Sequence, residues 1–282
     1  MKLIQYLARC LLCLSATLAL NSYAAPKPEL WEHWLQHNPQ SKTVIDHREW
    51  SHFLATYIAT HNDSNTAMQG INTFDYANVT VSDKQRLKSY LAKLTALPIS
   101  EYNRHQQRAY WINLYNALTI DVVLDHYPVK SIMDIKLSGF FTRGPWEKKL
   151  ITVEQLPLSL NDIEHRILRP IWHDPRTHYA VNCASLGCPN LNTTAYTADK
   201  MEQQLEQAAS AFINHPRGVN VQNGKLIVSS IYSWFKDDFG DSDDKIIEHL
   251  TQYANAPLLQ PLSSIQQIYD DQYDWSLNEV RE

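Results

Sequence analysis

Two cysteines stand five positions apart in the segment HYAVNCASLGCPNL, residues 178–191. A nucleophilic thiol needs partial exposure, a lowered pKa and a nearby base. Cys183 ends an apolar run, and small residues follow it, so another molecule can approach the sulfur. Ser185 and the neighbouring backbone N–H groups can receive the oxyanion of a tetrahedral intermediate. We therefore take Cys183 as the candidate nucleophile of an acyl-transfer site.

The base for this thiol must be a histidine, and His165 is the favoured one. It follows Glu164 inside an apolar helical pattern, where a histidine and a carboxylate are unusual. Neighbours on a helix point about 100° apart, so either Glu164 or Asn161, one turn back, is expected to orient the imidazole. If residues 178–183 form a strand, His178 points away from Cys183 and is the weaker candidate.

Buried amides are the third group of candidates. The segment 101–127 is apolar on more than one face, which predicts a buried helix that carries Asn113 and Asn116. Buried amides need hydrogen-bond partners. They either satisfy a loop or, together with Asn182, support the substrate or its oxyanion.

The two cysteines also allow hypotheses in which neither of them is a nucleophile. In an oxidising compartment Cys183 and Cys188 can form a small structural disulfide, and a reversible disulfide can gate a catalytic thiol. With His165, and with Glu164 or His178, the pair can instead supply zinc ligands, although their spacing is looser than the usual CxxC. The hypotheses are therefore a cysteine-dependent peptidase, amidase or transpeptidase, a non-catalytic binding or scaffold domain, and a zinc hydrolase.

The beginning of the chain predicts export. Residues 1–24 combine Lys2 and Arg9 with an apolar run at 11–20 and small residues before a cleavage site after Ala24 or Ala25. Cys10 and Cys13 leave with this signal peptide. The apolar run is too short for a permanent span, so we expect a periplasmic or secreted protein without a membrane span; the alternative is a retained N-terminal anchor.

Composition excludes several classes of function. A net charge of -5 and the absence of a basic run predict no nucleic-acid partner. Phosphate loops, dinucleotide fingerprints and haem attachment motifs are missing from the sequence, so we expect no such cofactor and no resident metal in the leading hypothesis.

The elements that must position these residues predict an α+β protein. We expect a helical N-terminal elaboration at 25–100, followed by a domain at 101–282 with a small, mainly antiparallel sheet in the C-terminal half. Helices are expected at 28–37, 47–61, 84–97 after an Asp83 cap, 101–127, 159–168, 197–215 after a Thr197 cap, 231–240 and 244–254. Strands are expected at 148–153 and 178–182, in a hairpin at 219–228 with an Asn-Gly turn, and at the edge near 268–278.

Four sequence blocks resemble the DUF547 family, whose function is unknown. They are AYWINLYNALTIDVVLDHYPVKSIMDI, PLSLNDIEHRILRP, HYAVNCASLGCPNL and IYSWFKDDFG, in the order of the family. Phe235 departs from the pattern, because a tyrosine is expected there. The resemblance implies an exported bacterial protein, a fold distantly like that of thiol proteases, and a suspected triad that falls here on Glu164, His165 and Cys183. The resemblance leaves the substrate and the reaction open, and our own expectation is a peptide or a cell-envelope substrate.

Overall fold

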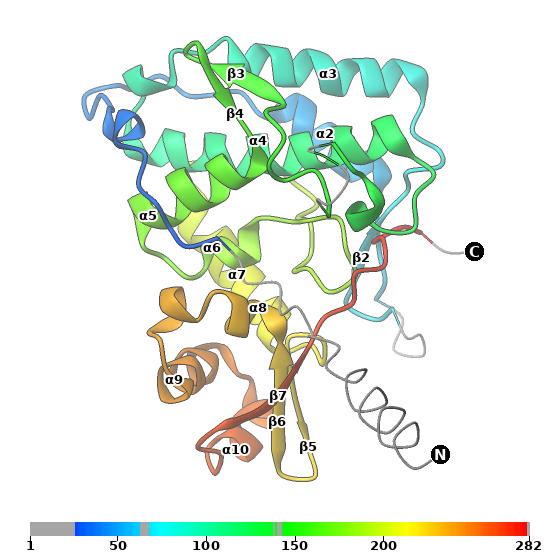
Figure 1. The fold of residues 1–282 in the computed structure, drawn as a ribbon, viewed down its shortest axis with the longest axis vertical. Helices are drawn as coiled ribbons and strands as arrows, with labels where there is room; N and C mark the ends of the chain where they lie inside the picture. Colours follow the sequence, from blue (N-terminus) through cyan, green and yellow to red (C-terminus); the bar gives the residue numbers. More distant parts are fainter. Residues whose placement is uncertain (1–25, 63–67, 138, 140–142, 281–282) are drawn as a thin grey trace, which may run out of the picture.

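Two hydrophobic clusters organise the chain, and the candidate residues lie where the clusters meet. The structure, a computed structural model, describes residues 26–62, 68–137, 139 and 143–280. The predicted signal peptide at 1–24 lies outside these residues. Figure 1 shows the helices of the first cluster in the upper part, and the sheet of the second cluster in the lower part.

The upper part is built around one buried helix, α4 (Arg104–His126). It begins after Asn103, whose side chain accepts a hydrogen bond from the backbone N–H of Gln106. Most of its side chains are buried on every face, as the sequence predicts. It packs against α3 (Val81–Thr95), which in turn packs against α2 (Arg48–Tyr57). Around these lie the strands and turns β1 (Ile58–Thr60), β2 (Asn72–Phe74), η1 (Glu32–Leu35), η2 (Ile99–Glu101), η3 (Ile132–Asp134), β3 (Ile151–Val153) and β4 (Leu156–Leu158).

The segment that carries Glu164 and His165 is a π-helix, η4 (Asp162–Leu168), which continues into α5 (Arg169–Trp172). Arg169 N–H donates to the carbonyl of Glu164, five residues back. Pro170 has no N–H to offer the carbonyl of Arg166. The freed carbonyls of His165 and Arg166 instead accept from the backbone N–H groups of residues 29 and 31. A chain segment far away in the sequence therefore fixes the register of this helix.

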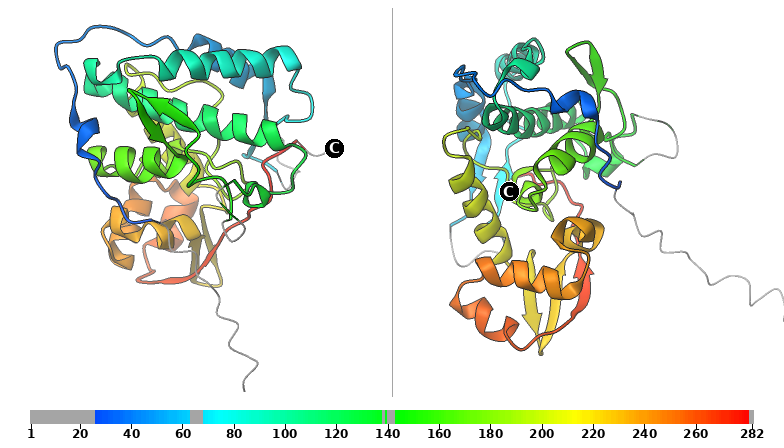
Figure 2. Two further views of the ribbon diagram at one scale, coloured as in Figure 1. Left: turned by 45° about the horizontal axis from the view of Figure 1, so that its top comes forward. Right: turned by 90° about the vertical axis from the view of Figure 1, so that its left-hand side faces the viewer.

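The lower part holds a mixed three-stranded sheet. Its order is β5 (Val219–Gln222), β6 (Lys225–Ser229), β7 (Ile268–Gln272), with β5 and β6 antiparallel and β6 and β7 parallel. The predicted Asn-Gly hairpin is confirmed, with positive φ at Asn223 and Gly224. The second cluster also includes residues of α8 (Ser230–Trp234), η5 (Lys236–Phe239), α9 (Asp243–Tyr253) and α10 (Ala256–Leu262), whereas α6 (Thr177–Ala180) and α7 (Met201–Ile213) contribute to both clusters. Figure 2 shows α9 and α10 beside the sheet.

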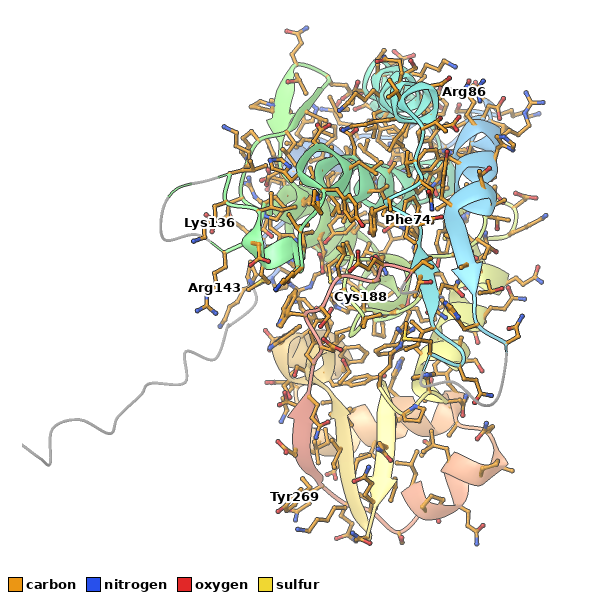
Figure 3. All side chains as sticks on the ribbon, turned by 90° about the vertical axis from the view of Figure 1, so that its right-hand side faces the viewer. Phe74, Arg86, Lys136, Arg143, Cys188 and Tyr269 are labelled. Carbon is orange, nitrogen blue, oxygen red and sulfur yellow. The ribbon has the colours of Figure 1, made fainter. Side chains whose placement is uncertain are left out.

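The residues after β7 join the two parts. In Figure 1 this segment rises from the sheet to the region of β2. Its backbone bonds to the cysteine loop, because Leu186 N–H donates to Ser276 O and Gly187 N–H donates to Asp274 O, both at 2.8 Å. Figure 3 shows Cys188 at the junction of the upper and lower parts, beside this segment. The segment thus covers one side of the cysteine loop.

The predicted fold class is confirmed: the protein is helix-rich with small, mostly antiparallel sheets. The mixed character of the C-terminal sheet and the β1–β2 pair in the N-terminal half were not predicted. The domain boundary at residue 100 stays a prediction.

Several element boundaries were wrong, each for a local reason. The helix expected at 28–37 is a single 3-10 turn, because the backbone of residues 29 and 31 bonds to η4. The helix expected at 47–61 ends at Tyr57, where β1 pairs with β2. The cap of α3 is Thr80, and Asp83 lies in the first turn. Thr197 does not cap α7, which follows Lys200.

The strand expected at 178–182 was also wrong, and this error affects the site. Asp174 Oδ1 accepts from the backbone N–H of Arg176, and Pro175 follows Asp174. An acidic residue followed by proline is a helix-start signal. His178 consequently lies on the short helix α6, and the strand alternation that turned it away from Cys183 does not apply.

Candidate active site

One pocket at the junction of the two clusters collects the predicted chemistry. It encloses about 630 Å³ of empty space, part of which is open to solvent. Both cysteines, Glu164, His165 and Asn161 line it, and so does His178. The remaining walls are mostly aromatic or apolar and come from Pro26, Tyr115, Trp146, Val181, Pro189, Ile231, Trp234, Phe235, Tyr273 and Trp275. The three residues of the suspected triad therefore share one cavity.

The cysteines form the sulfur end of the pocket. Both are free thiols; Cys183 is half-buried and Cys188 is buried. The backbone N–H of Cys183 donates to Cys188 Sγ at 2.9 Å. The hydroxyl of Tyr273 lies 2.9 Å from Cys183 Sγ and 3.3 Å from Cys188 Sγ, and Ser185 Oγ contacts both Cys183 Sγ and this hydroxyl.

Burial and hydrogen bonding act differently on the two thiols. Burial raises the pKa of Cys183 well above its ordinary value. Burial also opposes ionisation of Cys188, but hydrogen bonds from the Cys183 and Tyr273 groups outweigh it and lower the pKa of Cys188. A nucleophile waiting as a thiolate requires a lowered pKa, so in the unliganded pocket Cys183 is the protonated sulfur. Its hydrogen-bond partners among the described residues include no imidazole.

The imidazole end of the pocket is organised by Asp238. His178 Nε2 lies 2.7 Å from Asp238 Oδ2, and the buried guanidinium of Arg169 donates to the same carboxylate. Burial works against ionisation of Asp238, but the bonds from His178 and Arg169 prevail and lower its pKa to about 2. An ionised carboxylate accepts only, so it holds the proton of His178 on Nε2 and leaves Nδ1 as the acceptor in the neutral ring. Phe235 stacks on this ring at 4.1 Å between centroids.

His165 has the opposite arrangement. Arg169 Nη1 donates to His165 Nδ1 at 3.1 Å, so the neutral ring carries its proton on Nε2. Burial, together with the neighbouring Arg169 and His178, lowers the pKa of His165 to about 4 against the attraction of Glu164. At neutral pH this ring is therefore an N–H donor, suited to stabilise an oxyanion rather than to accept a proton.

Glu164 connects the two histidines and the sulfur end. Its Oε1 lies 3.8 Å from His178 Nδ1 and 4.0 Å from His165 Nδ1. Tyr115 on α4 lies next to it. Burial raises the pKa of Tyr115, and the nearby charges of Glu164, Cys183 and Cys188 raise it further. The Tyr115 hydroxyl is thus within electrostatic reach of both ends of the pocket.

Asn116 and Asn182, two of the three predicted amides, bond to the cysteine loop and to the residues next to it. Asn113 bonds to the backbone N–H and carbonyl of Tyr196. Asn116 donates to Ala180 O and accepts from the backbone N–H of Asn182, and the Asn182 side chain bridges Ala184 N and Pro189 O. This matches the alternative in which buried amides satisfy a loop. None of the three amides lines the pocket, nor does Ser185, whereas Asn161 does.

Sequence reasoning missed several contributors. Tyr115 lies in the segment that was predicted only as a buried helix, and the incorrectly predicted strand pointed His178 away from Cys183. Tyr273 lies in the expected edge strand without a chemical signal. Arg169 and Asp238 had only weak signals in the sequence. Arg169 lies one turn after His165, and Asp238 belongs to an acidic pair in the block 231–240.

A zinc site finds no support in the arrangement of side chains. Within residues 26–62, 68–137, 139 and 143–280, no three His, Cys, Asp or Glu side chains are grouped as ligands of one ion. In the same residues no helix has both the length and the apolar character that a membrane span requires.

The fold and pocket together define a helix-rich α+β domain with a thiol and histidine–carboxylate pocket. Residues 99–213 match the family described as "protein of unknown function, DUF547", and the predicted resemblance to this family is confirmed over these residues. The matched segment contains both cysteines, both histidines and Glu164, whereas Asp238 and Tyr273 lie beyond it. No curated protein and no solved structure matches the chain.

Proposed function

We propose that the protein is an exported, thiol-dependent acyl-transfer enzyme of the peptidase, amidase or transpeptidase class. One observation carries the proposal: a half-exposed free thiol, a carboxylate-bound histidine and a second, buried carboxylate line the same open pocket. These are the roles of a nucleophile, an acid–base group and its orienting carboxylate. A peptide or cell-envelope carbonyl compound is the proposed substrate.

The hydrogen bonds redistribute the roles within the suspected triad. Cys183 Sγ attacks the carbonyl carbon, and the electron pair of the C=O bond moves onto its oxygen. The Glu164–His178 pair accepts the thiol proton, with Tyr115 between the pair and the sulfurs, and returns it to the leaving group when the tetrahedral intermediate collapses. The N–H of His165 stabilises the oxyanion. Water or an amine then releases the acyl group from the sulfur.

Acyl transfer to the protein is the direct test. The full chain, with Cys10 and Cys13 replaced by serine, is treated with p-nitrophenyl acetate, and the acyl adduct is located by peptide mass spectrometry. We expect an adduct on Cys183 that Cys183→Ala abolishes, and about 100-fold slower formation in His178→Asn. His249→Gln changes a buried histidine outside the pocket and serves as the matched control. Equal release of p-nitrophenol by wild type and Cys183→Ala contradicts the proposal.

A non-catalytic binding domain is the second candidate, and one observation favours it. The thiol of Cys183 is bonded to Ser185 and Tyr273, and burial raises its pKa. Under this alternative the wild-type protein gives no acyl adduct, and Cys183→Ser folds as stably as the wild type.

Export is proposed from the sequence of residues 1–24. N-terminal sequencing of the periplasmic or secreted protein is expected to begin at Ala25 or Pro26. An intact N-terminus in the membrane fraction would instead identify a retained anchor.

A further inference from the structure

The sulfur end of the pocket contains a second thiol, Cys188, in addition to the proposed nucleophile Cys183. Both thiols contact a single hydroxyl, that of Tyr273, at 2.9 Å and 3.3 Å. The backbone N–H of Cys183 also points at the other sulfur, at 2.9 Å. An acyl-transfer site requires one sulfur, so the second sulfur has no role in the function proposed above.

The loop between the cysteines is folded back so that its two ends meet. Cys188 N–H donates to Ser185 O at 3.1 Å, and Ala184 adopts a positive φ of 58°. The side chain of Asn182 bonds to the backbone at both ends of the loop, at Ala184 N and Pro189 O. The sulfurs are therefore held near each other by the loop itself.

A half-buried cation, Arg217, contacts the cysteine loop at Leu186. Arg217 donates to the carbonyl of Leu186 and to the side-chain oxygen of Asn190, which are both neutral acceptors. Among the described residues no carboxylate forms an ion pair with it, and its buried Nε has no hydrogen-bond partner. Burial lowers the pKa of Arg217 to about 10, whereas negative charge on Cys188 or Tyr273 opposes this change. Cys188 and Tyr273 are thus the groups whose negative charge would stabilise Arg217.

We propose that Cys183 and Cys188 form a reversible disulfide by exchange with low-molecular-weight disulfides, with Cys183 as the accessible sulfur and Cys188 as the resolving one. Cys183 passes its proton to the Cys188 thiolate and attacks the disulfide RSSR. A mixed disulfide forms on Cys183, and one RS⁻ leaves with that proton as RSH. The Cys188 thiolate then attacks the Cys183 sulfur and expels the second RS⁻, which takes a proton from solvent.

Two electrons pass from the cysteine pair to RSSR, which is reduced to two thiols. Oxidation removes the nucleophile and thereby closes the pocket to acyl donors. This consequence rests on the proposed function, whereas the dithiol couple does not.

Glutathione buffers provide the test. The full chain with Cys10→Ser and Cys13→Ser is equilibrated at a series of reduced-to-oxidised glutathione ratios, alkylated and analysed by intact mass. We expect a folded species that loses two hydrogens and resists alkylation at both cysteines. In Cys188→Ser the product is instead a stable glutathione adduct on Cys183, because the resolving sulfur is absent.

Two further variants examine the assigned roles. Cys183→Ser is expected to react with oxidised glutathione at least ~10-fold more slowly than Cys188→Ser, because its remaining sulfur is buried. Arg217→Gln is expected to accumulate the mixed disulfide, since the charge that favours the resolving thiolate is gone; Arg86→Gln, an exposed arginine remote from the pocket, is the matched control.

The outcomes separate this inference from the proposed function. A wild-type protein that keeps a glutathione adduct as long as Cys188→Ser does, or that forms the internal disulfide only when unfolded, overturns the inference. If the reduced protein accepts an acyl group but never forms the internal disulfide, the proposed enzyme function stands and the proposed dithiol–disulfide couple is wrong. If the internal disulfide forms but no acyl group is transferred, the couple stands and the enzyme function is wrong.

Discussion

The two ends of the pocket are built by different means. At the sulfur end, hydrogen bonds join one short loop to a single tyrosine, Tyr273. At the imidazole end, an ion pair between Arg169 and Asp238 and a hydrogen bond between His178 and Asp238 join three separate segments. The nucleophile is therefore held mainly by local chain geometry, whereas the acid–base group depends on a buried charge network. Each end is therefore expected to fail in its own way.

Removal of the central carboxylate should have the largest effect. In Asp238→Asn the buried Arg169 guanidinium and the His178 ring lose their shared anion. Leaving a buried charge unpaired costs several kcal/mol, so we expect the free energy of unfolding in urea to fall by about 4 kcal/mol. Asp237→Asn, an exposed neighbour, is the control, with a change of less than about 0.5 kcal/mol. A loss as small as that of the control contradicts the charge network.

The pH dependence of stability should be the next largest effect. Burial holds the pKa of His165 in the folded protein at about 4, below the ordinary 6.5, so the fold favours the neutral ring. Its stabilising contribution is complete above pH 6.5 and is lost as the pH falls towards 4, because the unfolded chain takes up the proton first. Between pH 7 and pH 4.5, His165→Gln is expected to lose about 2.4 kcal/mol less stability than the wild type.

His249 provides a second buried histidine with which the effect of His165 can be compared. Burial lowers its pKa to about 4 as well, but it lies outside the pocket and bonds to Tyr179. His249→Gln should therefore reduce the loss of stability on acidification and leave the rate of acyl transfer unchanged. His165→Gln should reduce both the loss of stability and the rate of acyl transfer. If both variants keep the wild-type loss on acidification, the two rings are not held neutral by burial.

Crowding the sulfur end should give an intermediate effect. A Cβ on Gly187 would lie 2.8 Å from the backbone N of Asp274 and 3.0 Å from Cδ1 of Tyr273. Gly187→Ala is expected to displace this segment, to destabilise the protein by about 2 kcal/mol, and to increase the iodoacetamide labelling of Cys183. Gly224→Asn, in a turn where a Cβ meets no atom within 4 Å, is the control. Unchanged labelling would mean that residues 273–274 do not shield the thiol.

Removal of one hydroxyl should have the smallest effect. Tyr273→Phe keeps the ring and removes the group shared by Cys183, Cys188 and Ser185. We expect a loss of about 1 kcal/mol in unfolding free energy and a higher pKa of Cys188, measured by thiolate absorbance. Tyr269→Phe, on the exposed face of β7, should change neither quantity. A pKa of Cys188 that stays constant in Tyr273→Phe would show that this hydroxyl does not stabilise the thiolate.

The sequence predicted what depends on local pattern. The all-round apolar character of residues 101–127 indicated the buried helix, and Asn223-Gly224 indicated the hairpin. The cysteine loop was recognised from residue types alone. Asp238 could not be paired with His178 across 60 positions, nor Tyr273 with Cys183 across 90, because side-chain chemistry alone does not specify such distant contacts. The π register of η4 likewise depends on backbone groups more than 130 residues earlier in the chain.

Pro26 lines the pocket from near the start of the described residues, and Tyr273 and Trp275 line it from near their end. A growing polypeptide therefore contains its cysteine loop before it contains Tyr273, which follows Cys188 by 85 positions. The sulfur end of the pocket is complete only after this later segment has been synthesised and has folded onto the loop.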